Sequence, residues 1–331
     1  MTRAAVIGAG AWGTALADLL ARNGHETVLW AFEHDVVESV NARHENRFLA
    51  GATLAPALRA TADLRDAMDG ATLVCVATPS QHLRAILSRG VASIPRNAIV
   101  CIASKGIERD TLALMSDVAA ELAPGRPVVA LSGPSFAAEV AARQPTAIVA
   151  ASDDPAAAEA VQEAFSNRAF RVYTHDDVVG VELGGSLKNV MAVATGICEG
   201  AGFGFNSRAA LITRGLAEMT RLGCAIGAKA ATFAGLAGIG DLVLTCTGSL
   251  SRNRAVGVAV GKGASLDDAL AGKETVAEGV ATARSALALA EREQVEMPIV
   301  TMVNRVLFDG HAPQDGVADL MSRELRAEQD A

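Results

Sequence analysis

Two patterns of apolar positions divide the chain. Over roughly its first half, short runs rich in β-branched residues alternate with amphipathic stretches, which is typical of parallel strands joined by helices. Several of these runs are apolar throughout, as expected where helices cover both faces of a sheet. The predicted strands cover residues 4–8, 26–30, 73–77, 99–103, 128–131, 147–150 and 171–173.

Beyond the last of these runs the strand pattern stops and helical periodicity takes over. Leu183, Leu187 and Val190 recur at intervals that place them on one face of a long helix. The 331-residue chain also exceeds the size at which single cores usually stop growing. We therefore expect an α/β domain with a parallel sheet over residues 1–177 and an all-α domain over residues 178–331.

Composition excludes several classes of protein. The net charge of -8 and the pI near 5.3 leave no basic patch for a nucleic acid, so we expect no such partner. The five cysteines are an odd number without a C-x-x-C pair, which predicts reduced core residues and no metal site. We find neither a signal peptide nor an apolar run of ~18 residues, and therefore expect a cytoplasmic protein without a membrane span.

Three glycines mark a candidate phosphate-binding turn. Gly8, Gly10 and Gly13 have the G-x-G-x-x-G spacing, directly after a predicted strand and at the start of a predicted helix. In a Rossmann-type domain these glycines allow a tight turn, the approach of a pyrophosphate and close packing of helix on strand. Ala11 and Trp12 would then begin the helix whose N-terminus faces the phosphates. An ordinary glycine-rich turn is the alternative.

Cofactor choice depends on the end of the second strand. Phe32 and Glu33 follow that strand, and Glu33 lies twenty residues after Gly13. A carboxylate there can bond the adenine ribose of NAD and would repel the extra phosphate of NADP. We therefore predict a preference for NAD and leave the degree of NADP use open. In the alternative interpretation Glu33 is a solvated first residue of the next helix.

The second domain holds a candidate catalytic lysine. Lys188 and Asn189 follow Gly184 and Gly185 in a predicted helix, whose small side chains would let another surface come close. Burial and neighbouring cations lower the pKa of such a lysine toward the range useful for proton transfer. A surface lysine with a solvated ammonium group is the alternative.

Two further segments offer polar groups. Asp241 follows a glycine turn, where it either orients the lysine or substrate or simply caps a helix. Ser251, Arg252 and Asn253 precede a helix of small residues. They form either a phosphate seat or a solvated helix start.

The first domain has further candidate ligand-binding residues just after its predicted strands. Lys105 follows one predicted strand, and Gly133 and Ser135 follow the next. Ligands of open α/β sheets bind outside the carboxyl ends of the strands. Two lysines and an arginine with few acids suit an anionic substrate.

Taken together, these segments closely resemble the NAD(P)-dependent glycerol-3-phosphate dehydrogenases. The similarity runs nearly from end to end in several long motifs. These are GAGAWGTALA at 8–17, SKGIE at 104–108, LSGPSFAAEV at 131–140, ELGGSLKNVMA at 182–192, GFGFNSRAALITRGLAEM at 202–219, GLAGIGDLVLTCTGSLSRNR at 235–254 and TVAEG at 275–279.

The resemblance implies a function and assigns residues to it. It implies interconversion of sn-glycerol 3-phosphate and dihydroxyacetone phosphate, which supplies glycerol phosphate for phospholipid synthesis, with Lys188 as proton acceptor. The glycerol phosphate site would be lined by Lys105, Gly133, Ser135, Asp241, Ser251, Arg252 and Asn253. The cofactor would contact Ala11, Trp12, Lys105, Ala137, Arg252, Val276 and Glu278.

The chain departs from the family pattern near the adenine ribose. Most bacterial members carry His or Arg near positions 32 and 33, whereas Phe32 and Glu33 resemble the W-x-F-E pattern of the NAD-specific eukaryotic members. The family also commonly has Ser in place of Ala11. Both departures concern the cofactor, and the first supports NAD over NADP.

Two other functions are compatible with these patterns. A β-hydroxyacid or 6-phosphogluconate type dehydrogenase also combines a Rossmann domain, a helical domain and a lysine beside an asparagine. A catalytically silent NAD-binding sensor would bind cofactor without turnover. For this chain we expect a phosphorylated small-molecule substrate and a homodimer.

Overall fold

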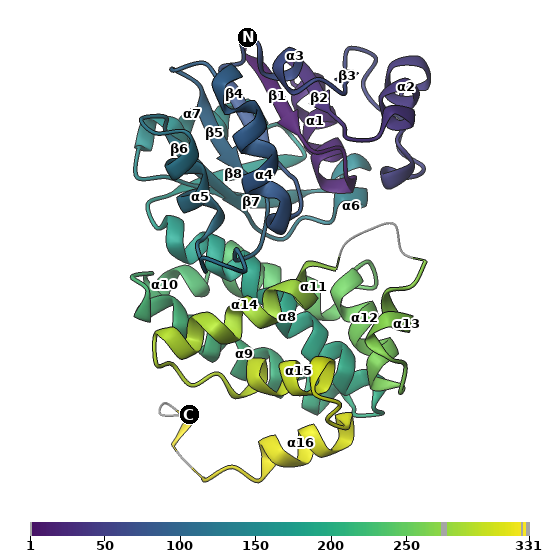
Figure 1. Cartoon of the computed structure of the whole chain (residues 1–331), viewed down its shortest axis with the longest axis vertical. Coiled ribbons are helices and arrows are strands. Elements are labelled where there is room, and N and C mark those ends of the chain that lie inside the picture. The colour runs from purple at the N-terminus through teal and green to yellow at the C-terminus, as the bar shows by residue number, and fades with distance from the viewer. Residues whose placement is uncertain (1, 273–276, 326, 329–331) are drawn as a thin grey trace.

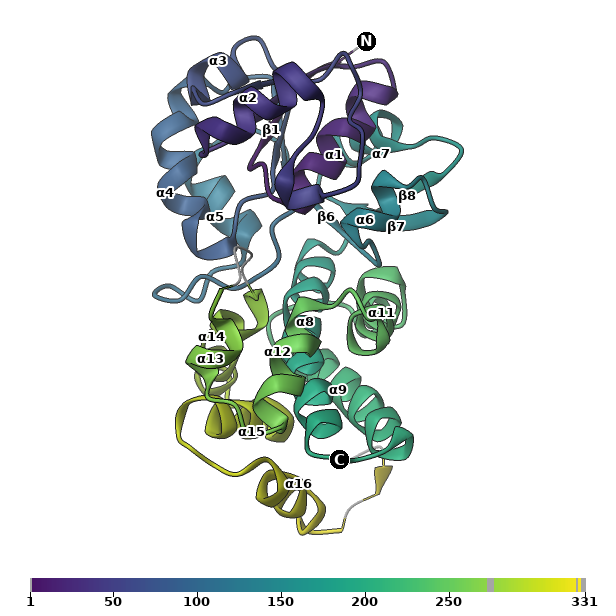
Figure 2. The ribbon, with the colours of Figure 1, turned by 90° about the vertical axis from the view of Figure 1, so that its right-hand side faces the viewer.

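The computed structural model describes residues 2–272, 277–325, 327 and 328. It has two parts, one above the other in Figures 1 and 2: an N-terminal domain built on a sheet and a C-terminal domain of helices. Val276, which we expected to contact the cofactor, lies outside the described residues.

The N-terminal domain is built on one eight-stranded sheet with the strand order β3-β2-β1-β4-β5-β6-β7-β8. All neighbouring strands are parallel except β6 and β7, which are antiparallel. The sheet is therefore mainly parallel, as predicted, with one antiparallel pair that was not predicted. The strands are β1 (Arg3–Ile7), β2 (Glu26–Trp30), β3 (Arg59–Thr61), β4 (Leu73–Val76), β5 (Ile99–Ile102), β6 (Val128–Ser132), β7 (Thr146–Ala151) and β8 (Phe170–His175).

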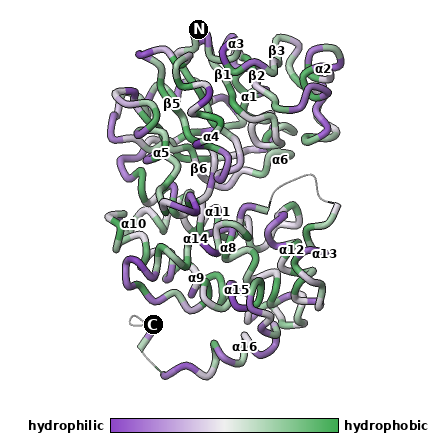
Figure 3. Tube along the Cα trace, in the orientation of Figure 1, coloured by the Kyte–Doolittle hydropathy of each residue, from purple (hydrophilic) through white to green (hydrophobic). Residues whose placement is uncertain are grey.

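Helices cover both faces of this sheet. They are α1 (Ala11–Arg22), α2 (His34–Arg43), α3 (Leu64–Met68), α4 (Ser80–Gly90), α5 (Met115–Leu122), α6 (Ala137–Ala141) and α7 (Pro155–Phe165), with the short 3-10 turns η1 (Arg47–Leu49) and η2 (Val91–Ser93). Successive residues of β1 point to opposite faces of the sheet. Ala4 and Val6 pack in the core under α1 and α7, whereas Ala5 and Ile7 pack in the core under α3, α4 and α5. The strands are accordingly apolar on both sides. Figure 3 shows hydrophobic residues along β1 and β5.

The C-terminal domain consists of helices around one central helix, α8. The elements are α8 (Val178–Gly200), α9 (Phe205–Ala225), α10 (Ala230–Phe233), the π-helical turn η3 (Leu236–Gly240), α11 (Asp241–Thr247), α12 (Arg252–Gly261), α13 (Leu266–Leu270), α14 (Glu278–Arg292), α15 (Pro298–Phe308) and α16 (Pro313–Met321). Every residue of α8 from Gly180 to Cys198 is buried. A helix covered on all sides in this way is the core of its domain.

Glycines bring α8 and α12 into backbone contact. Gly196 and Gly200 on α8 face Gly257 and Gly261 on α12, each pair at i, i+4 spacing. A Cβ atom at Gly257 would overlap the carbonyl oxygen of Val193 and lie 2.9 Å from the Ile197 nitrogen. The two helices therefore pack more closely than any residue larger than glycine allows at these positions.

Two buried carboxylates of the helical domain bond to helix starts of the sheet domain. Glu182 of α8 accepts hydrogen bonds from the Ser116 backbone nitrogen at 3.0 Å and from the Ser116 hydroxyl, in the first turn of α5. Glu278, the first residue of α14, accepts from the Ser80 hydroxyl at 2.7 Å in the first turn of α4. These contacts fasten α8 and α14 to the sheet domain.

One cysteine and one apolar stretch differ from what the composition predicts. Four cysteines are buried as predicted, but Cys224 is exposed near the end of α9, so its prediction as a core residue is wrong. One apolar stretch, Ala230–Thr247, is long and apolar enough to cross a membrane, and 44% of it is buried. It is not one continuous helix, because Gly238 inside it has φ -94° and ψ -106°.

Candidate active site

The glycine-rich turn between β1 and α1 leaves room for a phosphate. Gly8 has φ +114°, and a Cβ there would lie 2.9 Å from the Ala77 carbonyl oxygen. A Cβ at Gly13 would overlap the Gly8 carbonyl oxygen, whereas one at Gly10 would meet nothing within 4 Å. Two of the glycines therefore permit the turn, and the third keeps open the space in front of α1. These residues fit a dinucleotide, whose pyrophosphate would sit at the N-terminus of that helix.

Phe32 and Glu33 lie where the cofactor argument requires them, between β2 and α2. Phe32 is 71% exposed, and Glu33 is the residue before the first turn of α2. The Glu33 carboxylate caps no backbone nitrogen of that helix and forms no hydrogen bond or ion pair with the residues the structure describes. It is thus available to a ribose hydroxyl.

Three charged side chains from three separate segments meet between the two domains. Asp241 is fully buried and binds two lysines through its two oxygens. Lys105, which follows β5, donates to Oδ2 at 2.6 Å, and Lys188 of α8 donates to Oδ1. Lys105 also donates to the Gly133 carbonyl oxygen at 3.1 Å. The sequence predicted all four residues for this site, and the fold brings them together.

The environment of Lys188 weakens its hold on its proton. The residue is only 8% exposed, and burial lowers its pKa to about 8 from the usual 10.5. The Asp241 carboxylate counteracts this effect by raising the pKa of Lys188, and the nearby Lys105 ammonium lowers it. A lysine with a pKa near 8 can exchange a proton with a substrate at ordinary pH. The alternative of a solvated surface lysine is therefore wrong.

The structure also contradicts the alternative in which Asp241 caps a helix. Gly240 holds the cap position, and Asp241 is the first residue of α11, with its side chain turned to the lysines. Sequence reasoning missed Thr245, one turn further on, whose hydroxyl accepts from Lys188 at 2.9 Å. The i, i+4 spacing of Asp241 and Thr245 was the available signal.

A chain of amide contacts lies beside the lysines. Asn253 of α12 donates from Nδ2 to Asn189 Oδ1 at 2.9 Å, and its own Oδ1 accepts from the Gly279 backbone nitrogen at 2.9 Å. Both asparagine side chains are buried. The two predicted asparagines are thus neighbours although 64 residues separate them.

The predicted phosphate seat lies at the start of α12. The Ser251 hydroxyl accepts from the Arg254 nitrogen at 3.2 Å and so caps this helix, with its own proton free to donate. Arg252 forms no hydrogen bond or ion pair with any described residue. Desolvation lowers its pKa, and the carboxylate of Glu278 counteracts this. This exposed guanidinium, unpaired among the described residues, is available to a ligand phosphate.

The remaining predicted residues that the structure describes in the sheet domain are Gly133, Ser135 and Ala137. Gly133 has φ +144°, and a Cβ there would lie 2.8 Å from the Ile148 Cα, so only glycine fits. The Ser135 hydroxyl donates to the Gly133 carbonyl oxygen at 3.0 Å. Ala137 begins α6. Sequence reasoning missed Ser80, the partner of Glu278.

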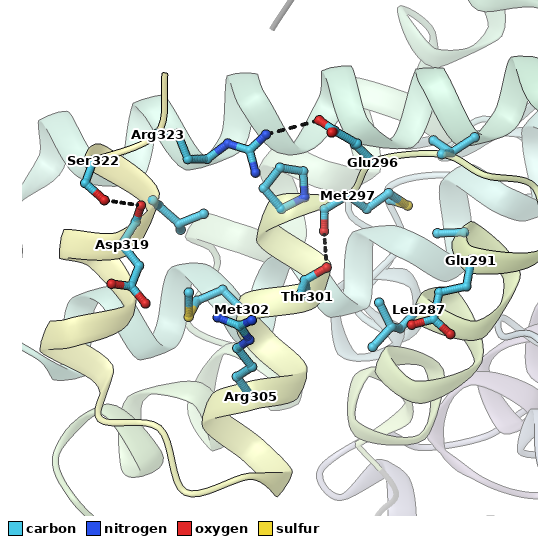
Figure 4. Close-up of a pocket in the computed structure, with 14 residues that line it drawn as sticks. Leu287, Glu291, Glu296, Met297, Thr301, Met302, Arg305, Asp319, Ser322 and Arg323 are labelled. Carbon is cyan, nitrogen blue, oxygen red and sulfur yellow. Dashed lines mark hydrogen bonds and ion pairs between the residues drawn. The ribbon is translucent and has the colours of Figure 1, made fainter. Parts of the chain in front are cut away.

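A separate cavity of about 530 Å³ lies between α14, α15 and α16 (Figure 4). Arg305 and Arg323 face it together with the carboxylates Glu291, Glu296 and Asp319. One of these arginines, Arg323, is bound to Glu296 at 3.1 Å. Three carboxylates against two guanidinium groups make this cavity a poor site for a phosphorylated ligand.

Family models for both halves match the chain. One, described as the N-terminus of NAD-dependent glycerol-3-phosphate dehydrogenase, matches residues 3–158, and its C-terminal counterpart matches residues 177–318. The chain belongs to this dehydrogenase family. It is an oxidoreductase that uses a nicotinamide cofactor, and its function is that of a glycerol-3-phosphate dehydrogenase rather than the hydroxyacid alternative.

Similar proteins match along their whole length. Proteins named glycerol-3-phosphate dehydrogenase [NAD(P)+] from Geobacter sp. (strain M21) and Geobacter sulfurreducens are 53% and 55% identical, each with 98% of both chains covered. The crystal structure of the Coxiella burnetii glycerol-3-phosphate dehydrogenase superposes with a TM-score of 0.94 at 40% identity, over 97% of this chain and 99% of that one. The enzyme from Saccharomyces cerevisiae superposes with a TM-score of 0.83 at 27% identity.

Proposed function

We propose that Lys105, Asp241 and Lys188 form the place where sn-glycerol 3-phosphate and dihydroxyacetone phosphate are interconverted. The observation that carries this proposal is the fully buried Asp241 carboxylate, shared by two ammonium groups from two domains. The carboxylate fixes both lysines in position, while burial keeps the pKa of Lys188 near neutrality. Such a pair can both move a proton and stabilise negative charge on a substrate oxygen.

The roles of the side chains follow from their charges. In oxidation, Lys188 accepts the proton of the substrate C2 hydroxyl, and the nicotinamide cofactor supplies the hydride acceptor. In reduction, Lys188 returns this proton, and Lys105 stabilises the oxygen as it gains negative charge. Arg252 and the amides of Asn189 and Asn253 hold the phosphate.

We place the cofactor along the turn at Gly8, Gly10 and Gly13, with NAD preferred over NADP. Support comes from the free carboxylate of Glu33, which would repel a 2′-phosphate. In a Glu33→Arg variant we expect the ratio of kcat/KM for NADH over NADPH to fall by roughly tenfold or more, which is about 1.4 kcal/mol. An unchanged ratio would remove Glu33 from the assignment. Glu38→Arg, a charge change further along α2, is the matched control.

We further propose a boundary between the domains at residues 177 and 178, a cytoplasmic location and a homodimer. Phe205, which is 82% exposed on α9, is an apolar side chain that a second subunit could cover. Sedimentation equilibrium of the wild type and of Phe205→Ser tests this point. A wild-type monomer would contradict it.

The first experiment on the whole proposal follows absorbance at 340 nm with dihydroxyacetone phosphate and either NADH or NADPH. We expect rapid oxidation of NADH and slower oxidation of NADPH. A Lys188→Ala variant should lose nearly all turnover and still bind NADH. Wild-type kcat in that variant would show that the proton moves elsewhere.

A further inference from the structure

The amide chain beside the lysines ends on a group whose direction is fixed. A backbone N–H can only donate, so the atom of Asn253 that lies 2.9 Å from the Gly279 nitrogen must be the carbonyl oxygen. The Nδ2 of Asn253 then points to the opposite side and donates to Asn189 Oδ1 at 2.9 Å. The Nδ2 of Asn189 in turn is left with one long contact of 3.5 Å, to the Gly185 carbonyl oxygen. One backbone N–H therefore determines how both carboxamides are turned.

Close packing holds this N–H in place. A Cβ at Gly279 would lie 2.5 Å from the Asn189 carbonyl oxygen and 2.9 Å from Asn253 Oδ1, so only glycine brings the first turn of α14 against α8. The neighbouring Glu278 anchors the same turn to the sheet domain through Ser80. The N–H is thus held from both domains.

We infer that Gly279 is a positioning residue that sets the polarity of the phosphate seat. Its N–H donates to the side-chain oxygen of Asn253, and Asn253 Nδ2 donates to the side-chain oxygen of Asn189. Because both oxygens are occupied in this way, the two side chains can offer only N–H groups to the substrate. Together with Arg252 they make a seat of donors, which selects an anionic phosphate over a neutral or donating group. This inference rests on the proposed function and specifies how the same site recognises its substrate.

Two variants with the same change of charge separate this arrangement from a merely structural one. In Asn189→Asp the new carboxylate still accepts from Asn253, whose orientation is unchanged, so one donor is lost. In Asn253→Asp the new carboxylate still accepts from Gly279, but its other oxygen faces Asn189 Oδ1. Asn189 must then turn to donate, and its carbonyl oxygen replaces its N–H toward the phosphate. This variant thus loses the donors of both asparagines.

The measurement is steady-state reduction of dihydroxyacetone phosphate and of unphosphorylated dihydroxyacetone, with NADH. Because a hydrogen bond to a charged group is worth about 1.5 to 3 kcal/mol, each lost donor should raise KM for the phosphate by roughly tenfold to a hundredfold. We expect the increase in Asn253→Asp to exceed that in Asn189→Asp by about tenfold or more. The kcat/KM for dihydroxyacetone should change much less in both. Asn206→Asp, an exposed position on α9, is the charge control.

Three outcomes are distinguished. If the wild type fails to reduce dihydroxyacetone phosphate, the proposed function fails. If the wild type is active but Asn189→Asp raises KM as much as Asn253→Asp or more, the assignment of polarity to Gly279 is overturned. Equal losses for the phosphorylated and unphosphorylated substrates would also overturn it. Thermal unfolding and NADH fluorescence titration of each variant identify a loss that comes from misfolding.

Discussion

The charge of Lys188 is controlled by two neighbours that act in opposite directions, and this predicts two opposite pH shifts. The free enzyme must hold Lys188 as the neutral amine to accept the hydroxyl proton. With a pKa of about 8, roughly one tenth of the molecules are in that form at pH 7. The kcat/KM for glycerol 3-phosphate oxidation should therefore rise about tenfold for each pH unit below 8 and level off above it.

Replacing Asp241 by Asn removes the carboxylate that favours the ammonium form of Lys188. At an effective dielectric constant of ~20, two opposite charges ~3 Å apart attract by roughly 5 kcal/mol. Lys105 shares this carboxylate at 2.6 Å and is left close to Lys188 without a counterion, which lowers the pKa of Lys188 further. Ionic partners typically move a pKa by about one to three pH units. We therefore expect the rising limb of the pH profile of kcat/KM to move from about pH 8 to roughly pH 5 to 7.

Replacing Lys105 by Met has the opposite sign. The ammonium of Lys105 lowers the pKa of Lys188, and its removal leaves Asp241 wholly to Lys188. The rising limb should move above pH 8, by on the order of one pH unit. Thr245→Val is the neutral control, because it removes a hydrogen-bond acceptor of Lys188 at nearly constant volume and without a change in charge.

The assay is initial-rate oxidation of glycerol 3-phosphate with NAD between pH 5.5 and 10 at constant ionic strength. The absolute rate of both charge variants will fall, so the position of the limb is the quantity compared. A limb that stays at the same pH in both variants, or moves in the same direction, would refute the assignment of Lys188 as the titrating base. Reduction of dihydroxyacetone phosphate should show the mirror-image dependence, since that direction needs the ammonium.

Two further predictions concern stability. Burial raises the pKa of Glu182 from 4.5 to about 8. Between these two pH values the folded protein keeps the Glu182 proton, whereas the unfolded chain loses it. The free energy of unfolding therefore falls as the pH rises from about 4.5 to about 8. The difference amounts to at most about 5 kcal/mol, and urea unfolding of Glu182→Gln should show a smaller loss of stability than the wild type between pH 5 and pH 8. In Gly257→Ala the new methyl group would overlap the Val193 carbonyl oxygen. This overlap should lower the free energy of unfolding by about 1 to 3 kcal/mol, which outweighs a helix-propensity gain of ~0.5 to 1 kcal/mol. A thermally more stable variant would contradict the backbone contact between α8 and α12.

Much of the fold could be predicted because its signals are local. Apolar runs bounded by turns identified every strand except β3, and the helical domain begins where the strand pattern ends. β3 has only three residues, Arg59–Thr61, and begins with an exposed arginine, so it shows no alternation. The antiparallel direction of β7 was also missed, because a buried apolar strand reads alike in either direction.

The candidate site was predicted one residue at a time, but its contacts were not. Lys188 and Asp241 lie 53 residues apart, and Lys105 and Asp241 lie 136 apart, so no local pattern pairs them. The contact between Ser116 and Glu182 was not predicted at all. Their hydrogen bonds exist only because α5 and α8 pack together in the folded protein.

The path of the chain between the domains has a consequence for how such enzymes can diversify. β8 ends at His175 and α8 begins at Val178, so Glu33, which we propose selects NAD over NADP, precedes this point, and the proposed phosphate seat at the start of α12 follows it. A genetic crossover here would exchange the proposed phosphate seat while keeping Glu33 of the first parent. The recombined enzyme would still have to bring Ser80, Lys105 and Ser116 from the first parent, since the second parent's carboxylates need them as partners.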